Sequence, residues 1–243
     1  MRLRIRFAKL GKVRFTSHRD VARIWERALR KAALPVAYSE GFSPRPKLSF
    51  GLALSTGFES HAEYLDIQLK EQDGGEAAPW DGTTADDMAR RLDKALPVGI
   101  DVLAVAPTDR GGDSLQQAVV SCTWAIDIDD LDTEQAAEQV ARLLAAEQIV
   151  VERERKGRIV CEDIRHQVLA LDVSEATETG VRLLADLGTQ PRALRPEELL
   201  AAMDPPLEAR SVCRMHQWML QEDARVEPLT VDAVPAPLAE VRA

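Results

Sequence analysis

The fold of the chain is decided by one basic stretch near its start, which runs from Arg14 to Gly51 and reads "RFTSHRDVARIWERALRKAALPVAYSEGFSPRPKLSFG". Ser17 can cap a helix here with Asp20 in its third position, and Pro35 disfavours helical geometry just before it. Apolar residues then recur at the i, i+3, i+4, i+7 spacing of a helix that buries one face: Val21, Ile24, Trp25, Ala28, Leu29 and Ala32. We therefore predict a helix from His18 to about Ala32.

Strands are expected on both sides of this helix. Residues 2–7 alternate arginine with Leu3, Ile5 and Phe7, which indicates a half-buried strand, and after a turn at Gly11 residues 13–15 are expected to continue extended. Downstream we predict strands at 47–54 and 62–69, a helix at 85–96 and a strand at 99–107. The order strand, helix, strand, strand, helix, strand is that of the ferredoxin-like fold, in which both helices cover one face of a sheet.

The second half of the chain repeats this order after a boundary at residues 108–114, with one strand more than the plan requires. We predict an α+β protein with two tandem ferredoxin-like (βαββαβ) domains, a basic one at 1–110 and an acidic one at 115–221. Residues 222–243 are rich in proline and have no apolar period, so we expect a flexible tail there.

Positive charge is concentrated at the start of a chain that is acidic overall. The 243 residues hold 31 Lys and Arg against 40 Asp and Glu, a formal net charge of −9. Residues 1–50 hold thirteen Lys and Arg and three acidic residues, a balance of +10, so the remainder carries −19. Such asymmetry is typical of a protein with one face that meets a polyanion.

The predicted helix places four arginines opposite its apolar face. Arg19, Arg23, Arg27 and Arg30 fall within about 80° of one another, and Lys31 lies at their edge. These four residues are called the arginine row below. A guanidinium can donate two parallel hydrogen bonds to a phosphate, so the row suits RNA, and a solvated helix face is the alternative. The arginines of residues 2–6 are expected to face the other side of the domain.

The loop after the helix supplies further candidates for binding RNA. Phe42 is the aromatic residue best placed to stack on a base, and Arg45 and Lys47 are close enough in sequence to add contacts to phosphate. Aromatic residues make up only 5% of the chain, so binding through shape and phosphate is better supported than reading of the base sequence.

His18 and Asp20 are the candidates for catalysis. The dipole at a helix N-terminus disfavours the imidazolium form, so His18 could act as an acid or base with Asp20 orienting it, although the same residues also make an ordinary helix start. The chain has no GxGxxG after a strand, no P-loop and no nucleophile elbow. Its three cysteines are widely separated, so we expect no metal or cofactor site.

The chain carries no sign of export or of membrane insertion. Its first residues, "MRLRIRFAKL", lack the unbroken apolar run of a signal peptide, and no window approaches the roughly 20 apolar residues of a membrane span. We expect a cytoplasmic protein that does not bind membranes.

A set of residues between Phe15 and Leu69 carries a family resemblance: Ser17, His18, Asp20, Arg23, Glu26 to Leu29, Leu34, Pro35, Tyr38, Ser39, Gly41, Phe42, Pro44, Pro46, Lys47, Gly57, Glu63 and Tyr64. Through them the chain resembles the radical SAM-linked protein family, a domain of unknown function found beside, or fused to, cobalamin-binding radical SAM proteins. The sequences "EDIR" at 162–165 and "LRPEELLAAM" at 194–203 fit that family more loosely. Arg19 stands where the family typically has leucine.

The resemblance implies a link to RNA metabolism, because genes of this family often lie near those of ribonuclease E/G and ribosomal proteins. It also implies a radical SAM protein as partner, which would carry any radical chemistry since this chain has no CxxxCxxC motif. The leading hypothesis is an RNA-binding accessory protein linked to a radical SAM enzyme or to RNA processing. The alternatives are an RNA-modifying or RNA-cleaving enzyme that uses His18 and Asp20, and a protein–protein adaptor.

Overall fold

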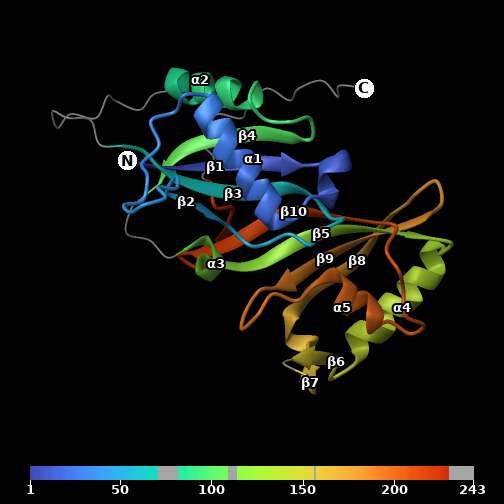
Figure 1. Cartoon of the computed structure of the whole chain (residues 1–243). Helices are drawn as coiled ribbons and strands as arrows, with labels where there is room; N and C mark the ends of the chain where they lie inside the picture. Colours follow the sequence, from blue (N-terminus) through green and yellow to red (C-terminus); the bar gives the residue numbers. More distant parts are fainter. Residues whose placement is uncertain (71–81, 109–113, 156, 230–243) are drawn as a thin grey trace. The chain divides into compact units, whose positions relative to one another are not determined.

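The computed structural model describes residues 1–70, 82–108, 114–155 and 157–229. The chain forms two units, one of residues 1–118 with 220–243 and one of residues 119–219. Both combine antiparallel sheet with a few helices, so the protein belongs to the mixed α+β class, as predicted (Figure 1). Among the described residues no helix is both long enough and apolar enough to cross a membrane.

The first unit follows the predicted order of elements. Its main elements are β1 (Arg2–Lys9), α1 (His18–Lys31), β2 (Leu48–Phe50), β3 (Glu59–Gln68), α2 (Gly82–Asp93) and β4 (Ile100–Thr108). Each strand pairs antiparallel with its neighbour in the order β4, β1, β3, β2. A short 3-10 helix, η1 (Gly11–Phe15), precedes α1, and a one-turn helix, α3 (Leu115–Ala118), follows β4.

The two long helices of the first unit, α1 and α2, pack on one face of this sheet. The inward side chains of β1, which are Leu3, Ile5 and Phe7, share a core with Trp25 of α1 and Leu92 of α2, and all five are at most 1% exposed. The apolar face predicted for α1 is therefore confirmed. Its start is confirmed as well, because the Ser17 hydroxyl accepts a hydrogen bond from the Asp20 amide at 3.2 Å.

The residues before α1 do not continue the strand as expected. Residues 11–15 form η1 instead, with Gly11 at φ +65°, a conformation that favours glycine. The buried Lys9 fixes this turn by donating from Nζ to the carbonyls of Arg14 (3.1 Å) and Thr16 (3.2 Å). As a result Phe15 is 62% exposed, whereas a strand at this position would have alternated its side chains between the two faces.

The second unit also has a sheet of four antiparallel strands, in the order β10, β5, β9, β8. Its elements are β5 (Val119–Asp129), α4 (Thr133–Ala145), β6 (Val150–Arg155), β7 (Arg158–Asp163), a 3-10 turn η2 (Arg165–Gln167), β8 (Val168–Ala176), β9 (Gly180–Gly188), α5 (Pro196–Ala201) and β10 (Ser211–Gln221). Strands β6 and β7 pair only with each other in the described structure, as a hairpin between α4 and β8. This hairpin adds two strands to the four of the ferredoxin-like plan, one more than the sequence predicted.

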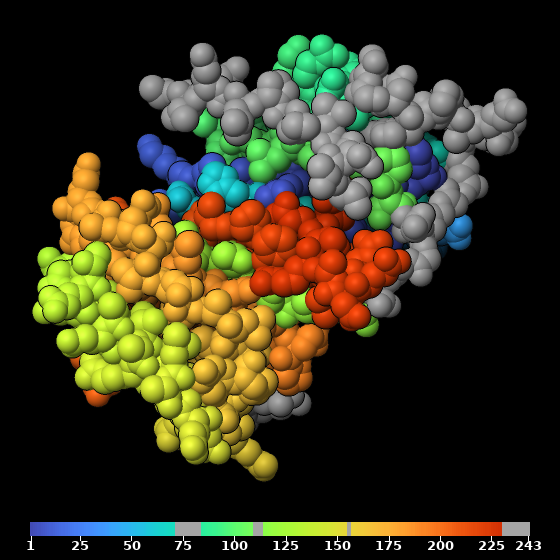
Figure 2. Space-filling model, turned by 180° about the vertical axis from the view of Figure 1, so that it is seen from behind, coloured from blue at the N-terminus to red at the C-terminus, as the bar shows by residue number. Residues whose placement is uncertain are grey.

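The segment from residue 222 onward differs from the predicted flexible tail as far as residue 229. It holds a short strand, β11 (Ala224–Val226), and the residues after it return to the first unit (Figure 2, red). There Glu227 pairs with Arg6 and the Pro228 carbonyl accepts from Arg4 at 2.9 Å. The sequence did not predict this ordered segment, because it is rich in proline and its partners, Arg4 and Arg6, lie more than 200 residues away in the chain. The rest of the predicted tail, and most of the predicted boundary at 108–114, lie outside the described residues.

Candidate nucleic-acid interface

The arginine row is exposed along the whole length of α1. Arg19, Arg23, Arg27 and Arg30 are all exposed, as is Lys31 at the end of the helix. Among the described residues, Arg23 alone of the row pairs with a carboxylate, that of Asp20, at 3.3 Å. Both side chains of that pair are more than half exposed, so solvent screening leaves it worth little. The row therefore presents almost its full positive charge to solvent.

Two residues of this surface are oriented by the backbone rather than by acidic side chains. Arg30 donates from Nε to the Glu26 carbonyl at 3.2 Å, and Lys31 donates from Nζ to the Lys94 carbonyl at 3.3 Å. A carbonyl carries no net charge, so these bonds hold the two side chains while their positive charge stays available to an anion. These two bonds thus fix the positions of Arg30 and Lys31 without neutralising their positive charge.

The arginines of β1 lie on the opposite face of the sheet, as expected, and internal acids neutralise them. Asp66 of β3 accepts from Arg2 at 2.7 Å and from Arg4 at 2.8 and 3.0 Å, and its side chain is almost fully buried. Arg6 pairs with Glu227. The strand arginines are consequently paired within the fold, and the unpaired positive charge considered for binding lies mainly on α1.

The loop after α1 holds Phe42 fully in solvent. Its base is closed by a Tyr38–Pro46 bridge and by two bonds between Ser39 and Arg45, from the Ser39 amide at 2.8 Å and to the Ser39 hydroxyl at 3.1 Å. Phe42 at the tip has a relative exposure of 110%, which means that no residue in the described part of the chain covers the ring. Arg45 is also exposed. This is the arrangement that a stacking residue on a projecting loop requires.

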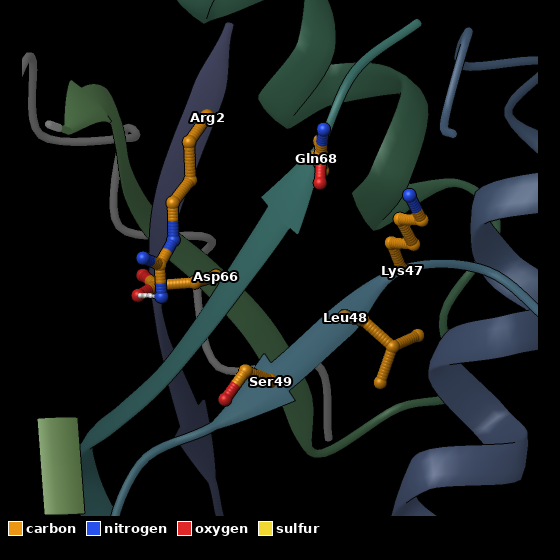
Figure 3. Close-up of a pocket in the computed structure, with 6 residues that line it drawn as sticks. All are labelled: Arg2, Lys47, Leu48, Ser49, Asp66 and Gln68. Atoms are coloured by element: carbon orange, nitrogen blue, oxygen red, sulfur yellow. Dashed lines mark hydrogen bonds and ion pairs between the residues drawn. The ribbon is translucent and has the colours of Figure 1, made fainter. Parts of the chain in front are cut away.

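Lys47 lies apart from the arginine row. It alternates with Leu48, which packs against the core beside the helices, so Lys47 and Ser49 point to the other face of the sheet (Figure 3). There they line a shallow hollow of about 520 Å³ whose other lining residues are Arg2, Leu48, Asp66 and Gln68. Because Arg2 is already committed to Asp66, the hollow offers an anion little beyond Lys47 itself, and the structure does not bring Lys47 together with the row.

His18 and Asp20 are not arranged as a catalytic pair. The Asp20 carboxylate accepts from the Ser17 hydroxyl at 2.8 Å and from Arg23, so it completes the helix start. Two residues that are two positions apart on a helix point to different sides. The His18 ring is exposed and meets the edge of Phe50 at 5.2 Å between ring centres. The geometry therefore assigns Ser17 and Asp20 to capping, and within the described residues no acidic side chain is hydrogen-bonded to His18 to orient it for catalysis.

Phe15 is a candidate that the sequence did not suggest. It is 62% exposed directly before the cap of α1, and the Arg14 guanidinium lies over its ring at 4.9 Å. Arg14 in turn pairs with Glu59 at 3.1 Å, which helps to fix it in this position. The signal that could have revealed Phe15 is Gly11, whose positive φ turns the chain out of the strand.

In the second unit, the "EDIR" sequence at 162–165 holds the chain together rather than forming a site. Asp163 accepts from the amides of Ile149 (2.9 Å) and Arg165 (3.0 Å), and these two bonds hold the pKa of its carboxyl below the ordinary value. Arg165 donates to the carbonyls of Leu144 and Ala146 at the end of α4, at 3.1 and 3.2 Å. In the described ranges no group of three or more His, Cys, Asp and Glu side chains is placed to hold a metal ion.

These features define an α+β protein with one exposed cationic helix and exposed aromatic residues beside it. A family model for uncharacterized proteins conserved in bacteria, DUF2344, matches residues 2–196. The chain belongs to this family. The match runs from the start of β1 through α3 in the first unit and covers most of the second unit. Comparison with curated proteins gives no match.

Proposed function

We propose that the protein is an RNA-binding accessory protein, in which α1 grips the phosphates of an RNA strand. The observation that carries this proposal is the arginine row, four exposed guanidinium groups on one helix with a single weak ion pair among the described residues. Repulsion within such a row is relieved by an anionic partner, and guanidinium groups match phosphate oxygens in shape and charge. The loop with Phe42 and Arg45 supplies a second contact in this proposal.

The acidic remainder of the chain supports the same function. Outside the first 50 residues the formal charge is −19, which would repel RNA from other surfaces and limit binding to the basic segment. Within that segment the strand arginines are neutralised by Asp66 and Glu227. An RNA would therefore be guided to α1 in particular.

We also propose that each unit is a version of the ferredoxin-like fold. The orders β4, β1, β3, β2 and β10, β5, β9, β8 support this, since both place the first and third strands of a unit at the centre. The second unit then carries the β6–β7 hairpin as an insertion. The resemblance to the radical SAM-linked family supports a radical SAM protein as the partner to which the bound RNA is presented.

A salt titration of RNA binding tests the proposed role of α1. Filter binding of labelled tRNA or ribosomal RNA fragments would be measured between low and moderate salt for the wild type and for the Arg23→Ala, Arg27→Ala double variant. Each lost contact to phosphate should reduce the slope of log affinity against log salt by about 0.7 to 0.9, so the double variant should lose about 1.5. The matched control removes two exposed arginines of the second unit, Arg158→Ala and Arg195→Ala, and should keep the wild-type slope.

The same experiment separates RNA binding from the other functions considered. Unchanged affinity and slope in the Arg23, Arg27 variant would rule out α1 as the site of binding to RNA. Retention of an acidic protein partner after nuclease treatment, lost in that variant, would instead indicate an adaptor. Modified or cleaved RNA produced by the pure protein and abolished by His18→Ala would indicate an enzyme.

A further inference from the structure

Three exposed aromatic rings lie at the two ends of α1. In residues 1–70 and 82–108 the large apolar side chains that are exposed are Phe15, Tyr38, Phe42 and Val98. Phe15 directly precedes the start of α1, and the loop with Tyr38 and Phe42 follows its end. Exposing an aromatic ring to water is unfavourable, so a concentration of rings around one helix points to a surface that a ligand covers.

The topology places Phe15 and Phe42 at opposite ends of the sheet. Phe15 follows the end of β1, whereas the loop with Phe42 is anchored where β1 begins, because Val36 pairs with Leu69 and the Leu69 amide donates to the Met1 carbonyl. The fourteen residues of α1 run between these ends over about 21 Å, given a rise of 1.5 Å per residue. The two rings thus bracket the arginine row along its length.

We propose that the ligand on the arginine row is unpaired RNA, with one base stacked on Phe15 and another on Phe42. This inference rests on the proposed function and adds the class of RNA to it. In a duplex both faces of every internal base are covered by its neighbours, so a protein ring can stack only on bases that are unpaired. If α1 bound duplex RNA by shape alone, the exposed ring of Phe42 at the tip of its loop would contribute nothing to binding.

The two rings are prepared for stacking in different ways. The Arg14 guanidinium covers one face of Phe15, and Arg14 is held by Glu59, so the ring is fixed with its other side available. Phe42 stands free on a loop whose base is closed by hydrogen bonds. A strand long enough to reach both rings needs at least about four nucleotides, the lower end of site sizes for single-strand binding modules.

Fluorescence anisotropy with labelled RNA tests this inference on the full chain. The probes are an unstructured octanucleotide, a dinucleotide and a blunt-ended duplex with the octanucleotide sequence, all at the same salt concentration. We expect the octanucleotide to bind at least tenfold more tightly than the duplex. Phe15→Leu and Phe42→Leu should each weaken octanucleotide binding about five- to tenfold and leave the salt slope unchanged, while Phe42→Trp should preserve binding.

Short probes and cross-linking make the test specific for two stacking sites. A dinucleotide cannot reach both rings at once, so the other ring can still bind it and each single leucine substitution should cost it only about twofold, less than the same change costs the octanucleotide. Octanucleotides with 5-iodouridine should cross-link under long-wavelength light to peptides that contain Phe15 and Phe42. Ile159→Ala, which truncates an exposed side chain of the second unit, is the control and should change no affinity.

The possible outcomes separate this inference from the proposed function. Binding that depends on Arg23 and Arg27 but is equal for single strand and duplex, and unchanged in both leucine variants, would refute stacking and leave the RNA-binding role intact. RNA binding that does not depend on Arg23 and Arg27 would refute both the stacking inference and the proposed role of α1 in RNA binding.

Discussion

Asp127 is the residue whose substitution tests the structure of the second unit most directly. Its carboxylate lies on β5 and accepts from Arg182 at 2.7 and 3.2 Å, from Ser211 at 2.9 Å and from Arg210 at 3.3 Å. Arg182 on β9 and Ser211 on β10 are its register partners on the two flanking strands. One side chain that is only 9% exposed therefore ties three strands together.

The expected loss of stability follows from these contacts. A hydrogen bond to a charged group contributes about 1.5 to 3 kcal/mol, but the Arg182 side chain is 37% exposed, so solvent screening reduces its share. Asp127→Ala should lower the free energy of unfolding by about 2 to 4 kcal/mol, because it also leaves the donors of Arg182 and Ser211 without their acceptor. Asp127→Asn keeps the shape and one acceptor and should cost about 1 to 2 kcal/mol.

The stabilisation by Asp127 should depend on pH. The hydrogen bond from Arg182, followed by that from Ser211 and the nearby arginine charges, holds the pKa of the Asp127 carboxyl below its ordinary value. The unfolded state therefore takes up a proton more readily, so the stabilisation is complete above the unfolded pKa of about 4 and is lost as pH falls through the lower folded pKa. The gap between wild type and Asp127→Asn should shrink below about pH 4.

Urea unfolding followed by circular dichroism at pH 7, 5 and 3.5 measures both effects. Asp172→Asn changes an exposed aspartate of β8 and serves as the control, with an expected change within about 0.5 kcal/mol. Equal stability of Asp127→Asn and wild type at pH 7 would refute the role assigned to the carboxylate. A gap that stays constant from pH 7 to pH 3.5 would refute its electrostatic origin.

Two further predictions concern the first unit. Trp25→Ala empties the centre of a core in which the indole ring packs edge-on against Phe7 at 4.9 Å, so a cost of about 3 to 5 kcal/mol is expected in thermal unfolding, whereas Trp25→Phe should cost less than half of this. Gly99→Ala places a Cβ 2.4 Å from the Leu10 carbonyl oxygen at a backbone φ of +92° and should cost about 2 to 4 kcal/mol in urea unfolding. Gly11→Ala shares the positive φ but meets no atom within 4 Å, so it should cost only about 1 kcal/mol, and equal costs at the two glycines would contradict the proposed clash.

The order of elements in the first unit could be predicted because its signals are local. The apolar period of α1 and the cap at Ser17 placed its start at the correct residue and its end within one residue. The alternation of β1 correctly assigned its arginines to one face and Leu3, Ile5 and Phe7 to the other. These features depend on neighbours within a few positions of each other in the chain.

The partners of charged residues could not be predicted because they lie far apart in sequence. Nothing near Arg4 indicates that Asp66 accepts two of its hydrogen bonds, or that Glu227 pairs with Arg6. The sequence therefore overstated the charge available to a ligand in the first 50 residues. For the candidate site, the exposure of the arginine row and of Phe42 agrees with what the sequence indicated, whereas Phe15 required knowledge of η1 and the position of Lys47 required the pairing of β2 with β3.

The β6–β7 hairpin has a consequence for how this protein can change in length. The hairpin is closed at its base, where the Ile164 amide donates to the Ile149 carbonyl at 2.8 Å and Asp163 accepts from the Ile149 amide. Residues added or removed at its turn, near Gly157, would alter its reach while β5, β8, β9 and β10 keep their pairing. The turn is thus a natural attachment point for a fluorescent label or an affinity tag, remote in the chain from every residue that the RNA experiments change in the first unit.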